Sequence, residues 1–139
     1  MRSQPPAPRT LRAAAAASMA IDAATVEAVS ALTEAGIDTV LLKGPALAKL
    51  LYDPGEERSW DDADLLVDPA LHDAAMATLE TIGFRPRIAS ALERGSVPHA
   101  VHLIRPSRAP GVEWESIDLH TSFAGVGAEL PTFLSLIHI

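Results

Sequence analysis

The spacing of apolar residues predicts one long helix at the start of the chain. Between residues 10 and 35 apolar positions recur at helical spacing, as Val26, Val29 and Leu32 show. Ala, Leu, Met and Glu dominate this stretch, and all four favour helices. Gly36 follows directly, and a glycine at this position is typical of a helix end.

The rest of the chain alternates between strand-like and helical patterns. Apolar runs predict strands at residues 38–43, 62–67, 97–104 and 112–120. Asp68-Pro69 has the residue types of a helix N-cap and first helical position, and predicts a helix that Gly83 ends. Pro45 predicts a further short helix through Tyr52. The predicted order is helix, strand, helix, strand, helix, strand, strand.

The two ends of the chain differ from its centre. Residues 1–9 are polar and rich in proline, which predicts a disordered tail. Residues 10–133 have the length of a single domain. Residues 134–139, LSLIHI, match a translated transposon end of the kind used in sequencing libraries. We interpret them as adaptor-derived rather than as an ordinary apolar segment, so we expect the domain to be truncated at its C-terminus.

Composition and charge narrow the classes of function. The formal net charge is -7, which disfavours non-specific nucleic-acid binding because phosphates need a basic surface. The chain has no cysteine, so disulfides and thiolate metal sites are excluded. The early alanine run favours helix over an export signal, and no apolar run approaches the roughly 20 residues of a membrane span. We expect a cytoplasmic protein, with the Ala, Arg and Pro usage of bacterial proteins.

The motif Asp62-Ala63-Asp64 is the main candidate for chemistry. Side chains two apart in a strand point to the same side, so the two carboxylates project together. Adjacent anions repel one another and favour binding of a cation. Mg²⁺ takes oxygen ligands and leaves positions open for substrate phosphates. The motif therefore predicts a site for Mg²⁺ or Mn²⁺.

A third acid lies in the apolar run Ile117-Asp118-Leu119-His120. An acid in such a run is costly to bury unless it is paired or metal-bound. We predict that the strand at residues 112–120 lies beside the strand at residues 62–67. Asp118 would then join the first two aspartates, and three carboxylates can hold two metal ions for an in-line displacement at phosphorus.

Three further residues are candidates for phosphate binding. Lys43-Gly44 stands between a predicted strand and a predicted helix, and a helix N-terminus attracts phosphate through its free amides. Lys43 supplies a charge, and Gly44 allows a close approach of the ligand. Arg58 precedes Asp62 by four residues and is the second candidate phosphate ligand.

The segments LLKGPALAKLLY, RSWDDADLLVD and IDLH stand in this order, with an aliphatic helix and histidines before the last. Together they resemble the uncharacterised nucleotidyltransferase family of the DNA polymerase beta superfamily, over about residues 40–120. The resemblance implies an α/β (α+β) fold with a mixed β-sheet flanked by helices. It also implies nucleoside triphosphate and Mg²⁺ as partners, with Asp62 and Asp64 as the metal pair and Asp118 as the third carboxylate. The implied reaction moves a nucleotidyl group to an acceptor hydroxyl and releases pyrophosphate.

Other interpretations of the motifs remain open. Members of the superfamily usually carry Gly-Ser where this chain has Gly44-Pro45, so a serine that would contact the triphosphate is missing. A catalytically silent nucleotide-binding or partner-binding module is therefore one alternative. An Asp-x-Asp glycosyltransferase is another. The acceptor, a small molecule or a protein, is not specified by the sequence.

Aromatic and histidine residues receive no catalytic role from the sequence. His99 and His102 are three apart and so cannot share a strand face. We expect His120 to orient a neighbour or to pack in the core, and Trp114 to serve as a packing residue.

Overall fold

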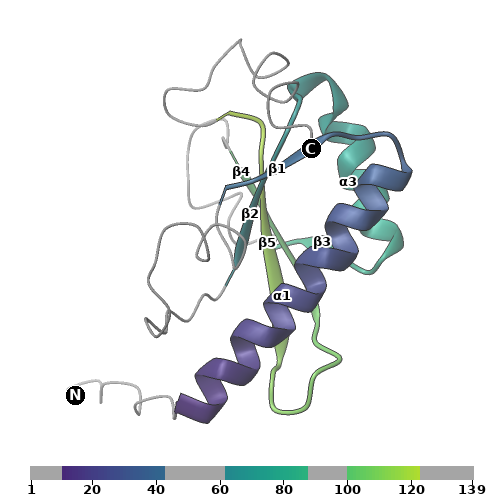
Figure 1. The fold of residues 1–139 in the computed structure, drawn as a ribbon. Helices are drawn as coiled ribbons and strands as arrows, with labels where there is room; N and C mark the ends of the chain where they lie inside the picture. The colour runs from purple at the N-terminus through teal and green to yellow at the C-terminus, as the bar shows by residue number, and fades with distance from the viewer. Residues whose placement is uncertain (1–10, 43–61, 88–99, 123–139) are drawn as a thin grey trace, which may run out of the picture.

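The computed structural model describes residues 11–42, 62–87 and 100–122, which form a five-stranded mixed sheet and its helices (Figure 1). In chain order the elements are α1 (Leu11–Glu34), β1 (Thr39–Leu41), β2 (Ala63–Val67), the 3-10 helix η1 (Pro69–Leu71), α3 (His72–Thr81), β3 (Arg85–Pro86), β4 (Ala100–Pro106) and β5 (Trp114–His120). The strand order across the sheet is β1-β2-β5-β4-β3. β2 and β5 are parallel, whereas the other neighbours are antiparallel. The predicted fold class is confirmed.

The predicted elements are found with small shifts of their ends. The helix predicted after Asp68 begins as η1, where the Asp68 carboxylate accepts a hydrogen bond from the Ala70 amide at 2.8 Å. The strand predicted to end at Ile104 continues to Pro106. β3 was not predicted, since two exposed residues carry no hydrophobic pattern. The helix predicted after Pro45 and both predicted tails lie outside the described residues.

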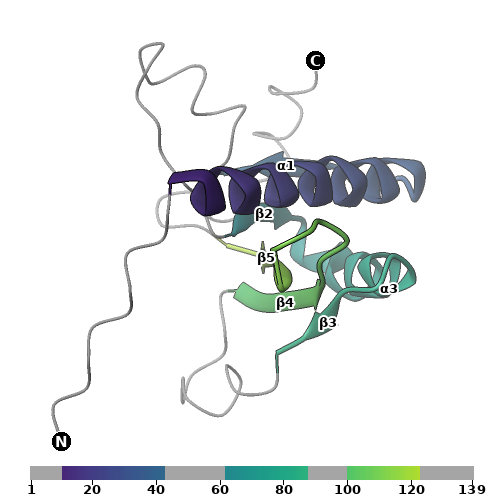
Figure 2. The same cartoon turned by 90° about the horizontal axis from the view of Figure 1, so that it is seen from below.

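The core lies between the sheet and the two α-helices. Both views place α3 beside the C-terminal half of α1 (Figure 1, Figure 2). Apolar side chains of both helices pack with those of three strands, and the central members include Leu32, Leu79, Leu65, Ile117 and Leu119. Because strand side chains alternate, the residues between these positions in β2 and β5 face away from the helices. Asp64 and Asp118 occupy such positions.

α1 also has the length and composition of a membrane span. It has 24 residues, and its most apolar window has a mean hydropathy of 1.3. One side of it carries buried residues, among them Ile21, Ala24, Ala28 and Leu32, which belong to the core of the domain. A core helix passes the same test of length and composition. The buried side of α1 packs in the core of the domain, and location in the cytoplasm stays a prediction.

A buried arginine ties the helices to the β4–β5 hairpin. The Arg105 guanidinium donates to Glu115 at 2.7 Å, to Glu27 of α1 at 2.6 Å and to the Ile82 carbonyl at 2.8 Å. It also lies 4.6 Å from the centroid of the Phe84 ring. Burial disfavours its charge, but the hydrogen bonds to both glutamates outweigh burial and raise the pKa of Arg105. These contacts connect segments that are far apart in the chain.

Glu27 gives this network a dependence on pH. Its hydrogen bond from Arg105, against the opposing effect of burial, holds the pKa of Glu27 below its ordinary value of 4.5. A carboxylate with a lowered pKa stabilises the fold above its unfolded pKa, and this contribution is lost as the pH falls through the folded pKa. We expect Glu27→Gln to lower the melting temperature by about 2–4 °C at neutral pH, since the group is part-exposed. The difference from wild type should disappear near pH 3, and an equal difference at both pH values would contradict this account.

Candidate functional site

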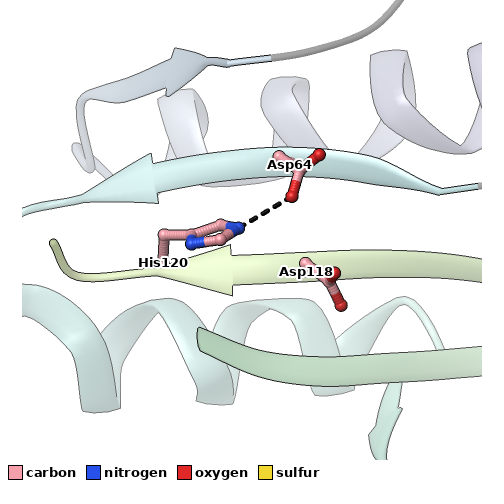
Figure 3. A group of neighbouring side chains, drawn as sticks. All are labelled: Asp64, Asp118 and His120. Atoms are coloured by element: carbon pink, nitrogen blue, oxygen red, sulfur yellow. Dashed lines mark hydrogen bonds and ion pairs between the residues drawn. The ribbon is translucent and has the colours of Figure 1, made fainter. Parts of the chain in front are cut away.

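The parallel pairing of β2 with β5 creates the candidate site. Its register sets Asp64 opposite Asp118 and Leu66 opposite His120. Asp64 is buried, with 5% of its surface exposed, whereas Asp118 and His120 are half-buried. One ligand atom from each of Asp64, Asp118 and His120 lies within 4.8 Å of the others. In Figure 3 the three side chains stand on the sheet face opposite the helices. The prediction that these two strands are neighbours is confirmed.

His120 holds the Asp64 carboxylate in place. Its Nε2 lies 2.8 Å from Asp64 Oδ1, and Nε2–H is the donor because the carboxylate can only accept (Figure 3). The imidazole is largely shielded, with 17% of the side chain exposed. Such a hydrogen bond fixes the orientation of a carboxylate, and this is how partners of metal ligands act in protein sites. The expectation that His120 orients a neighbour agrees with this contact.

His102 makes the corresponding contact to Asp118, and sequence reasoning missed it. It lies on β4 directly opposite Asp118 in the antiparallel β4–β5 register. Its Nδ1 donates to Asp118 Oδ1 at 2.5 Å. Each of the two carboxylates therefore accepts a hydrogen bond from one histidine of the sheet. The signal that could have revealed His102 is the register of the hairpin, in which residues 107–113 connect the two strands.

The profile of one protein family, described as uncharacterised nucleotidyltransferase, matches residues 7–132. The match covers most of the chain and includes every strand of the sheet. The chain belongs to this nucleotidyltransferase family. Searches of curated proteins and of solved structures find no match. The family assignment agrees with the resemblance drawn from the sequence motifs.

The remaining predicted site residues lie in or next to undescribed segments. Asp62 is half-buried and directly precedes β2, so its strand begins one residue later than predicted. Among the described residues, the group within 4.8 Å contains His120 and does not include Asp62. The roles predicted for Lys43, Gly44 and Arg58 fall outside the described part of the chain. Asp62 as a metal ligand stays a prediction.

The Leu42 backbone is hydrogen-bonded to the strand that carries Asp64. The Leu42 amide donates to the Asp64 carbonyl at 2.8 Å. Lys43 and Gly44 follow Leu42 directly in the sequence, so the last described residue before them is hydrogen-bonded to the backbone of Asp64.

The donor set of this family member fits a hard divalent cation. Two carboxylates offer oxygen atoms from adjacent strands, and Mg²⁺ and Mn²⁺ take such ligands. His120 offers a nitrogen, but its hydrogen bond to Asp64 suits the role of an orienting partner. The structure therefore provides a candidate metal centre at Asp64 and Asp118.

Metal binding at this centre should be visible in thermal unfolding. Mg²⁺ or Mn²⁺ in large excess over its dissociation constant is expected to raise the melting temperature by about 5 °C, because it binds the folded state alone. Asp64→Asn combined with Asp118→Asn should abolish the rise. Asp73→Asn is the matched control, since this carboxylate is fully exposed on α3. A rise that survives in the double variant would contradict the centre.

Proposed function

We propose that this chain is a metal-dependent nucleotidyltransferase that moves a nucleotidyl group from a nucleoside triphosphate to the hydroxyl of an acceptor. The site would consist of Asp64 and Asp118, with Asp62 as the third carboxylate and Mg²⁺ or Mn²⁺ as the cofactor. The observation that carries the proposal is the β2–β5 register, which brings two carboxylates together in a member of a nucleotidyltransferase family.

The proposed reaction is a displacement at the α-phosphorus of the nucleoside triphosphate. The acceptor oxygen forms a bond to the α-phosphorus, and the bond from that phosphorus to the bridging oxygen breaks. Pyrophosphate leaves with the electron pair, and the hydroxyl proton passes to Asp118. A divalent cation supplies charge stabilisation for the attacking and leaving oxygens when bound.

The described residues contribute to the proposed reaction by holding the two carboxylates in fixed positions. Asp64 and Asp118 stand on paired strands whose opposite faces are packed in the core, and rigid elements hold reacting groups more accurately than loops. His120 and His102 restrict the rotation of the two carboxylates through hydrogen bonds of 2.8 Å and 2.5 Å. This support is needed because a displacement of about 1 Å can cost a hundredfold in rate.

Release of pyrophosphate is the direct test of the proposal. The full chain is incubated with each α-labelled nucleoside triphosphate, with Mg²⁺ or Mn²⁺, with candidate hydroxyl acceptors, and with water as the fallback acceptor. We expect pyrophosphate and a nucleotidyl product that chelation of the metal abolishes. Tight nucleotide binding without any release would favour the catalytically silent module instead. Transfer from a nucleotide sugar would favour the glycosyltransferase.

Lys43 is expected to bind the triphosphate rather than the nucleoside. Loss of a charged hydrogen bond to phosphate costs about 1.5–3 kcal/mol, which is a factor of about ten to a hundred in affinity. Calorimetric titration of Lys43→Ala should show this loss for a triphosphate and little change for the nucleoside. Lys49→Ala, in the same segment of the sequence, is the matched control. Equal weakening for both ligands would refute the role of Lys43.

A further inference from the structure

A pocket of about 620 Å³ opens between the N-terminal half of α1 and the β4–β5 hairpin. α1 contributes Ala13 and Ala17, and the hairpin contributes Val112 and Trp114. Figure 2 shows the N-terminal turns of α1, in dark purple, extending past β5 and β4. This volume lies in the range of pockets that hold small molecules and is far too small for a folded macromolecule.

The pocket reaches the carboxylate site through two polar residues. His102 lines the pocket and also donates to Asp118. Ser116 lines it as well and lies two residues before Asp118 on the same strand face. Two residues of strand span about 7 Å and four span about 13 Å, so Trp114 marks the far end of a path to Asp118. A ligand about 13 Å long would contact both Trp114 and Asp118.

Trp114 gives the far end of the pocket its apolar character. It is one of the few large apolar side chains exposed in the described part of the chain, with 49% of its surface accessible. Trp114 is therefore only partly packed, whereas the sequence predicts a packing residue. An exposed aromatic side chain in a pocket favours an apolar or aromatic ligand, because covering it removes apolar surface from water. Ala13 and Ala17 of α1 line the same pocket with small side chains, and Arg87 and Glu113 add charged groups to the lining.

The pocket lies at the part of the sheet away from Asp64. The pocket lies on the other side of Asp118, against β4 and β5. In an in-line displacement the attacking and leaving oxygens lie on opposite sides of phosphorus. An acceptor in this pocket would approach the α-phosphorus from the β4 side of Asp118.

We propose that the pocket is the acceptor subsite and takes a small hydroxyl compound with an apolar or aromatic body. The body would lie against Trp114, with the hydroxyl directed past Ser116 and His102 to Asp118. The acceptor oxygen then forms the bond to the α-phosphorus, its proton passes to Asp118, and pyrophosphate leaves with the electrons of the broken bond. This assignment rests on the proposed function and specifies its acceptor as a small molecule.

The test uses 4-(4-fluorophenyl)butan-1-ol as the probe, since its ring and hydroxyl are separated by a chain of suitable length. Fluorine NMR measures its binding to the full chain and to Ala17→Leu, which fills the pocket. Ala15→Leu is the matched control, because Ala15 is exposed on the same helix and does not line the pocket. We expect Ala17→Leu to weaken binding about tenfold, as overfilling of a packed site costs about 1–3 kcal/mol, and Ala15→Leu to bind like wild type.

A transfer assay on the same proteins separates this assignment from the proposed function. With labelled triphosphate and metal, wild type should form the nucleotidyl ester of the probe, and Ala17→Leu should form about tenfold less. Transfer to water, seen as nucleoside monophosphate, should be equal in all three proteins. Equal probe binding in both variants, displacement of the probe by triphosphate, or transfer to water without ester formation would overturn the acceptor assignment alone. Absence of transfer to water and probe alike would overturn the proposed function and this assignment with it.

Discussion

Asp64→Asn is expected to lower the rate of pyrophosphate release about a thousandfold, the equivalent of the several kcal/mol that a catalytic metal supplies. The carboxylate is buried and paired with His120, so the amide keeps the volume of the side chain and removes its charge. His120 can still donate to the amide oxygen, which should preserve the local structure. The loss should therefore appear in kcat rather than in folding.

The measurement is steady-state release of pyrophosphate, with circular dichroism and melting temperature as checks of the fold. Asp73→Asn, at a fully exposed carboxylate, should retain the wild-type rate. If Asp64→Asn retained more than about a tenth of the wild-type rate, the assignment of Asp64 as a metal ligand would be wrong. Asp62→Asn in the same assay decides whether a third carboxylate belongs to the site.

Local pattern is sufficient to predict the central carboxylates. Asp64 lies in a short run of apolar residues, so the alternation of strand side chains assigns it to the face opposite Leu65. Asp118 lies between Ile117 and Leu119 and follows the same rule. Both pairs of apolar neighbours are indeed in the core. The period of two residues is therefore enough to assign each side chain of a strand to one face of the sheet.

Contacts between distant segments could not be predicted in this way. His102 reaches Asp118 only because the β4–β5 register pairs these two positions, and a slip of one residue would turn His102 to the other face. Arg105 meets Glu27 across 78 positions of sequence, and neither residue stands in a pattern that marks it. The pocket depends likewise on where α1 crosses the hairpin, which the packing of the whole domain determines. Sequence patterns therefore located the charged centre, and tertiary packing supplied its supporting histidines and the pocket beside it.

Arg105→Ala is expected to reduce the free energy of unfolding by about 3–5 kcal/mol, the usual cost of removing one partner of a buried ion pair. Only 5% of the Arg105 side chain and 5% of the Glu115 side chain are exposed. Without the guanidinium, Glu115 would remain buried with its charge uncompensated. The Ile82 carbonyl would also lose its hydrogen bond from Arg105, which loosens the attachment of α3 to the hairpin.

Urea unfolding at neutral pH, followed by far-ultraviolet circular dichroism, measures this loss. Arg108→Ala is the control, since Arg108 is 76% exposed and only 3.7 Å from the same Glu27, and an exposed pair contributes at most about 1 kcal/mol. A second variant separates charge burial from lost packing. Arg105→Met with Glu115→Leu removes both buried charges at similar volume and should recover much of the stability. A double variant no more stable than Arg105→Ala would show that the hydrogen bonds to Ile82 and Glu27, rather than the buried charge of Glu115, account for the loss.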